Sequence, residues 1–175
     1  FGYYLINNYF SIPSLSNFYI YSPICYFRMI SHVFGHTSWE HLNSNITHLL
    51  LVGPNCEREY GIYKITLIVF FTALSSSIVH ILFGPNNTIQ LGASGIVFMF
   101  ILLNSLIETK TTRIPMTFIC QVGIWCYREI IGHFLNSDGV SHLAHITGAV
   151  VGIISGYYLH HQREKEMVNK YVKVW

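Results

Sequence analysis

Hydrophobic residues in this chain are gathered into long runs, and the polar residues lie mostly between the runs. Apolar runs cover 62–83, 96–107 and 140–159. Runs of this length are typical of helices, and about 20 apolar residues are enough to cross a lipid bilayer. Together with two more polar segments they predict five helices, over 38–56, 62–83, 94–107, 114–134 and 141–159.

The chain before these helices has a different pattern. Residues 1–31 are aromatic and rich in Ser, Asn and Pro, with Pro13 and Pro23 as helix breakers. We expect 1–10 to be the end of a first core helix that is largely missing from this chain. The remainder is predicted to be a long loop, whose aromatic side chains suit the membrane interface.

Composition supports a membrane protein. Of the 175 residues, 51% are hydrophobic and 10% are charged, and the mean hydropathy is +0.41. Globular proteins contain about 25% charged residues, so the predicted fold class is an all-α, polytopic membrane helical bundle. A net charge of +2 without a basic patch argues against nucleic-acid binding. The four cysteines lack metal-type spacing and define no disulfide framework.

Basic residues fall unevenly on the two sides of the predicted bundle. One side holds Arg28 as its only clear basic residue, and the other side holds eight: Arg58, Lys64, Lys110, Arg113, Arg163, Lys165, Lys170 and Lys173. By the positive-inside rule, the side with eight is cytosolic. The predicted organisation is a helix end and extracytosolic loop over 1–37, a membrane core over 38–160 and a cytosolic charged tail over 161–175.

Two polar residues are placed at or in apolar runs: Ser94, in the tetrapeptide Gly92-Ala93-Ser94-Gly95 that opens the run 96–107, and His145, inside the run 140–159. Ionisable residues at membrane depth are costly and indicate functional sites. A serine and a histidine on separate helices are the minimum parts of a nucleophile and its base. Gly148 and Gly152 form a stripe near the face of His145 that allows a facing helix to approach closely. Gly92 and Gly95 remove side chains where backbone must approach a substrate.

His41 and Asn45 are four residues apart, hence on one face of the first predicted span. Both side chains donate hydrogen bonds while neutral, which suits stabilisation of an oxyanion together with the backbone N–H of Ser94. A polar seam joining two helices explains this pair equally well. Phe98, one turn after Ser94, is placed to stack beneath the His145 ring, although ordinary core or lipid-facing packing explains it better when it is considered alone.

Four motifs occur together in this chain: His41-x3-Asn45, Gly53-x3-Glu57-x3-Gly61, Gly92-x-Ser94-Gly95 and Ala144-His145-x2-Gly148-x3-Gly152. In type and order they resemble those of the rhomboid intramembrane serine proteases. The resemblance implies a six-helix core, a Ser94–His145 dyad, and an oxyanion hole formed by His41, Asn45 and the Ser94 amide. It also implies single-span membrane proteins as substrates, cut in or near a helix that unwinds easily.

Three function classes stay open. The first is an endopeptidase in which Ser94 attacks a peptide carbonyl and His145 accepts its proton. The second is a catalytically inactive rhomboid-like protein that binds transmembrane helices, although such relatives typically lack the serine or the histidine. The third is a small transporter or channel with His41, His48 and His145 lining a proton path. No metal or cofactor is expected, and the substrate, organelle and oligomeric state are left undefined.

Overall fold

The computed structural model describes residues 2–107 and 142–172, with positions 116, 119–120, 123–124 and 127 between them. This part of the chain is helical apart from one antiparallel pair of two-residue strands, β1 (Ile12–Pro13) and β2 (Ile89–Gln90). Short 3-10 turns occur at η1 (Leu15–Asn17) and η2 (His32–Phe34). The α-helices are α1 (Gly2–Tyr9), α2 (Pro23–Ser31), α3 (Trp39–Tyr60), α4 (Ile62–Phe83), α5 (Ser94–Ile107) and α7 (His142–Val172).

Four of the predicted helices correspond to α3, α4, α5 and α7. Pro54 lies inside α3, which continues past the predicted end at 56 and stops at Gly61, where φ is 81°. α7 continues through most of the predicted tail, as far as Val172. The predicted helix over 114–134 lies almost wholly outside the described residues. Arg128, Glu129 and His133, which have no assigned role, lie outside them too.

The chain before α3 has more regular structure than the predicted long loop. Pro23 begins α2 instead of breaking a helix, because the first helical position has no use for a backbone N–H. Arg28 of α2 donates from Nε to the Ser11 carbonyl at 2.5 Å and from Nη2 to the Asn7 carbonyl at 2.9 Å. These bonds tie α2 to α1 and to the segment that follows it.

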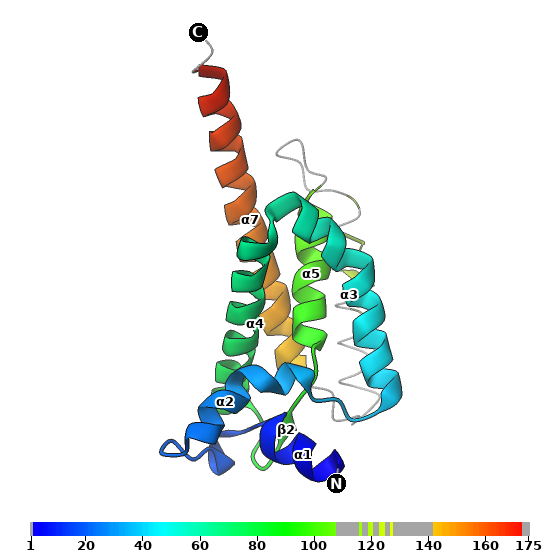
Figure 1. The fold of residues 1–175 in the computed structure, drawn as a ribbon, viewed down its shortest axis with the longest axis vertical. Helices are drawn as coiled ribbons and strands as arrows, with labels where there is room; N and C mark the ends of the chain where they lie inside the picture. Colours follow the sequence, from blue (N-terminus) through cyan, green and yellow to red (C-terminus); the bar gives the residue numbers. More distant parts are fainter. Residues whose placement is uncertain are drawn as a thin grey trace.

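Figure 1 shows α3, α4, α5 and α7 running along the long axis, with α1, α2 and the strand pair gathered at one end. α5 contacts both α3 and α7, and it lies at the centre of the bundle. α7 extends beyond the other helices at the opposite end. The buried core includes side chains from all four long helices, among them Cys56, Ile65, Ala73, Met99, Phe100, Leu103 and Leu159.

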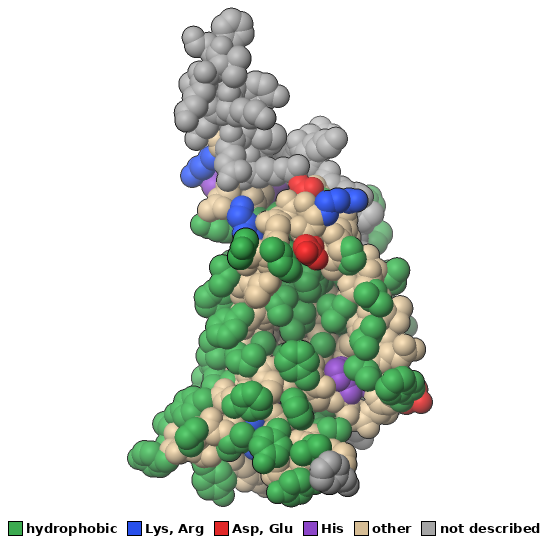
Figure 2. All heavy atoms as spheres, in the orientation of Figure 1, with side chains coloured by type: hydrophobic (Ala, Val, Ile, Leu, Met, Phe, Trp, Pro, Cys, Tyr) green, Lys and Arg blue, Asp and Glu red, His purple; other side chains and the backbone are tan. Residues whose placement is uncertain are grey.

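The surface of the bundle is strongly apolar. Among the described residues, α4 alone is both long and apolar enough to cross a membrane, while α5 is apolar but shorter. Figure 2 shows hydrophobic side chains over the middle of one face, with charged side chains gathered mostly near the end where α3 meets α4. Phe70, Phe71 and Leu82 of α4 are all exposed. A contiguous apolar surface of this kind marks a membrane or protein contact.

Candidate active site

Ser94 is the first residue of α5 and is half-buried. The chain enters the helix through Gly92, whose φ of 109° is a conformation that glycine adopts without strain. The Gly92 N–H donates to the His32 carbonyl at 2.9 Å, so the turn before Ser94 is held by the segment that precedes α3. Ser94 therefore lies at a helix N-terminus, where backbone N–H groups favour developing negative charge.

α5 and α7 approach each other through backbone. A Cβ atom at Gly95 would lie 2.9 Å from the Ala144 carbonyl oxygen, and one at Gly152 would lie 2.7 Å from that of Met99. At Gly148 an added Cβ would overlap the Gly95 carbonyl oxygen. The space left by Gly95 is thus filled by α7 itself, and the glycine stripe of α7 lies directly against α5.

His145 lies on α7 and is 9% exposed. Its ring contacts the Phe98 ring, with centroids 4.5 Å apart and planes inclined by 38°. Phe98 is one turn after Ser94 on the same face of α5. The first turns of the two helices therefore face each other, with Ser94 on one and His145 on the other. A hydrogen bond between Ser94 Oγ and His145 stays a prediction.

The beginning of α3 brings His41 and Asn45 to the same end of the bundle. Ser38 caps this helix by accepting the His41 N–H at 3.1 Å. Asn45 is 6% exposed and His41 is half-buried. A Cβ at Gly92 would lie 2.7 Å from His41 Cε1 and 3.8 Å from Asn45 Nδ2. Both side chains therefore lie against the turn that leads into Ser94, as donors to an oxyanion there would have to.

Two adjacent loop residues that the sequence did not place in the site contact this pair. His36 Nε2 lies 3.0 Å from Asn45 Nδ2, and its ring packs edge-on against the His41 ring at 4.9 Å. Thr37 Oγ1 lies 3.3 Å from His41 Nδ1. Burial lowers the pKa of His36, so its imidazole is neutral at physiological pH. His41 lies close enough to His36 and to His145 for their charges to influence it, so the side chains at the start of α3 lie near α7.

Two other histidines of the described chain, His48 and His32, contact different groups. His48 is exposed and bonds through Nδ1 to the Ser44 carbonyl at 2.7 Å. His32 is 1% exposed, and its Nδ1 lies 3.2 Å from Ser77 Oγ on α4.

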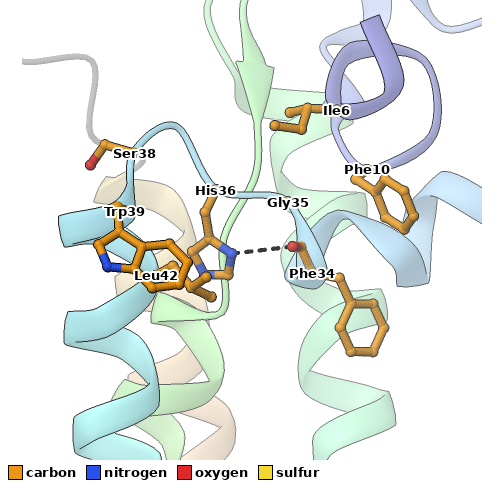
Figure 3. Close-up of a pocket in the computed structure, with 8 residues that line it drawn as sticks. All are labelled: Ile6, Phe10, Phe34, Gly35, His36, Ser38, Trp39 and Leu42. Carbon is orange, nitrogen blue, oxygen red and sulfur yellow. Dashed lines mark hydrogen bonds between the residues drawn. The ribbon is translucent and has the colours of Figure 1, made fainter. Parts of the chain in front are cut away.

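A pocket of about 450 Å³ opens beside His36, as Figure 3 shows. Its lining comes from α1 and the chain after it, the loop before α3, and the first turn of α3: Ile6, Phe10, Phe34, Gly35, His36, Ser38, Trp39 and Leu42. His36 Nδ1 bonds to the Phe34 carbonyl at 3.1 Å. One face of His36 thus lines an apolar pocket, while its Nε2 contacts Asn45.

Comparison with known proteins adds to this geometry. Residues 25–162 match the family model of the Rhomboid domain, and this range contains every candidate site residue described above. Rhomboid-like protein 11, chloroplastic, of Arabidopsis thaliana is 26% identical over 167 residues, covering 87% of this chain and 60% of that protein. Rhomboid-related protein 1 of Caenorhabditis elegans is 26% identical over 155 residues (83% and 43%). RHOMBOID-like protein 4 of Arabidopsis thaliana is 30% identical over 139 residues (75% and 34%). The chain spans between about a third and three fifths of the length of these relatives.

Proposed function

Because this chain belongs to the rhomboid family of integral membrane proteins, we propose that it is a serine endopeptidase that cleaves transmembrane segments of membrane proteins. The family includes serine proteases and inactive members, so the residues of the site decide between them. One observation carries the proposal: three separate elements meet at the N-terminal end of α5. They bring Ser94, the Phe98–His145 ring contact, and the His41–Asn45 pair to one place.

In the proposed reaction, Ser94 Oγ attacks the carbonyl carbon of the scissile peptide bond while His145 accepts the hydroxyl proton. The carbonyl oxygen becomes an anion, and His41, Asn45 and the Ser94 N–H donate hydrogen bonds to it. His145 then protonates the leaving amine. Water finally hydrolyses the ester on Ser94 and releases the second product.

Phe98 has a definite part in this mechanism. Its ring packs on the His145 ring and limits the rotation of the imidazole. In a Ser-His-Asp triad, a carboxylate holds the histidine in orientation. In the proposed Ser94–His145 dyad, the packing of the Phe98 ring supplies this orientation.

We further propose that the long helices span or enter the bilayer with Ser94 toward the extracytosolic side. The end of the bundle far from Ser94 carries Arg58 and Lys64 at the junction of α3 and α4. The end near Ser94 carries Arg28, whose guanidinium bonds to backbone carbonyls. This distribution supports the far end as the cytosolic one.

The test is cleavage of a quenched fluorogenic peptide with one transmembrane segment, using protein reconstituted in liposomes. Ser94→Ala and His145→Ala are each expected to lower kcat/KM by at least about 10⁴-fold. A fluorophosphonate probe should label the protein at Ser94 and fail to label Ser94→Ala. Cleavage that survives Ser94→Ala would overturn the proposal. An unlabelled, folded protein that still binds the peptide would instead be an inactive family member that binds transmembrane helices.

A further inference from the structure

We infer that two adjacent loop residues, His36 and Thr37, are positioning residues that orient the two side-chain donors of the oxyanion hole. His36 fixes the amide of Asn45, and Thr37 fixes the ring proton of His41. The inference rests on the proposed function, because it concerns donors to an oxyanion formed at Ser94. Neither loop residue belongs to the four sequence motifs of the family resemblance.

The first step is the protonation of His36. Its Nδ1 faces the Phe34 carbonyl at 3.1 Å, and a carbonyl oxygen only accepts, so Nδ1 carries the proton. In a neutral imidazole, Nε2 is then an acceptor. The lowered pKa of His36 favours this neutral form. His36 Nε2 therefore requires a donor, and the atom in contact with it at 3.0 Å is Asn45 Nδ2.

This contact decides which way the Asn45 amide faces. One hydrogen of Asn45 Nδ2 is donated to His36, and the second is left for another acceptor. A Cβ at Gly92 would lie 3.8 Å from the same nitrogen, so the amide nitrogen faces the turn before Ser94. If the amide were flipped, its oxygen would face both the bare His36 nitrogen and the developing anion, and both contacts would be repulsive.

Thr37 orients His41 in the same way as His36 orients Asn45. The Nε2 side of the His41 ring lies against Gly92, where a Cβ would come within 2.9 Å of Nε2. To donate toward an oxyanion, Nε2 must carry the ring proton, which leaves Nδ1 bare. Thr37 Oγ1 lies 3.3 Å from Nδ1 and can donate its hydroxyl proton there. A hydroxyl can bond to Nδ1 as donor or as acceptor, and we assign it the donor role, which accompanies the tautomer with the ring proton on Nε2.

The loop that carries these residues is held at both ends. The Gly35 N–H donates to the His32 carbonyl at 3.1 Å, and Gly35 packs so closely that an added Cβ would overlap the Phe10 carbonyl oxygen. At the other end, Ser38 caps α3. His36 and Thr37 therefore have fixed backbone positions from which to orient α3 side chains.

The experiment is a pair of double-mutant cycles on the fluorogenic transmembrane peptide in liposomes. His36→Phe, which keeps a ring but has no acceptor, is expected to lower kcat about 10-fold with KM unchanged. His36→Gln, which returns an acceptor near Nε2, is expected to restore kcat to within about twofold of the original. Thr37→Val keeps the shape without the hydroxyl and is expected to lower kcat about fivefold.

The double mutants distinguish a loss of donor orientation from a general disturbance of the site. Asn45→Ala is expected to lower kcat about 100-fold, and adding His36→Phe should cause no further loss, because the amide is already absent. Thr37→Val should likewise have no effect in a His41→Ala background. His48→Phe is the matched control, since His48 is exposed and also bonds a backbone carbonyl through Nδ1; its kcat should be unchanged.

Two different failures are distinguishable. If Ser94→Ala cleaves normally, the proposed function is lost and the inference with it. If Ser94→Ala is inactive but the His36→Phe and Thr37→Val losses multiply fully with those of Asn45→Ala and His41→Ala, the inference alone is overturned. Equal losses in His36→Phe and His36→Gln would also overturn it. Thr37 is exposed, so Thr37→Val folds and keeps the test decisive even where His36→Phe does not fold.

Discussion

The two helices that flank α5 meet it in different ways. α7 contacts α5 through glycines, with the backbone of one helix against the backbone of the other. α3 contributes few buried residues, Asn45 and Cys56, and its polar side chains reach the site with help from the loop before it. The proposed nucleophile and base are therefore carried by a tight interface, whereas the proposed oxyanion donors are carried by a hydrogen-bonded one.

Because of this difference, substitutions at the two interfaces should have different effects. A glycine interface has no side chain that can move aside, so an added methyl group must displace a helix. Hydrogen bonds from a loop can be lost singly, with an effect of about 0.5–1.5 kcal/mol each. Changes at the α5–α7 interface should therefore disturb folding and activity together, and changes at the α3 side should alter catalysis while the fold persists.

The largest effect is expected for Gly148→Val. The new side chain would overlap the Gly95 carbonyl oxygen, one residue after Ser94, and we expect a destabilisation of at least about 3 kcal/mol with complete loss of cleavage. The melting temperature in detergent and the liposome assay measure the two effects. Gly53→Ala is the control, because a Cβ at Gly53 meets no described atom within 4 Å. A Gly148→Val protein that melts and cleaves like the original would show that the interface is not rigid.

A smaller effect, on the stability of the fold, should follow from pH. Burial, together with the nearby His80 on α4, lowers the pKa of His32 to about 4. Between this value and about 6.5 the unfolded chain binds a proton that the folded protein does not, so stability falls as pH falls. We expect the free energy of unfolding to drop by about 2 kcal/mol between pH 7 and pH 5.

Melting temperatures of the original protein and of His32→Gln, measured at both pH values, isolate this contribution. His32 packs on Ser77 of α4, and its carbonyl accepts the Gly92 N–H. Glutamine does not titrate, so His32→Gln should lose clearly less stability on acidification. An equal loss in both proteins would assign the pH dependence to other groups.

Much of the fold could be predicted because the apolar runs are longer than β-strands and have the length of helices. α4 matches its predicted range, and α5 begins at Ser94 as expected. Helix ends were harder to predict where the apolar residues stop before the helix itself ends. The residues after Leu159 are polar but good helix formers, so α7 continues to Val172 without any apolar signal. α2 was missed because Pro23 suits a helix start as well as a break.

The site could be predicted only in part, for a related reason. Helical spacing put His41 with Asn45 and aligned the glycines of α7, because positions on a helix follow from sequence number. His36 and Thr37 lie in a loop, where no periodicity indicates which way a side chain points. Their contacts with α3 depend on the path of the chain through Gly35 and on the cap at Ser38.

The smallest effect is expected at Phe98, which lies on the α5 side of the α5–α7 interface. Its ring contact with His145 is a side-chain contact within the glycine-lined interface, so its loss should affect orientation more than folding. Aromatic packing of this kind contributes about 0.5–1.5 kcal/mol, and Phe98→Leu should therefore lower kcat by about two- to tenfold. Phe98→Tyr keeps the ring and should stay close to the original kcat. Because Phe98→Leu retains apolar volume, its melting temperature should change little; a large drop in melting temperature with normal kcat would make Phe98 a packing residue of α5 and remove it from the orientation of His145.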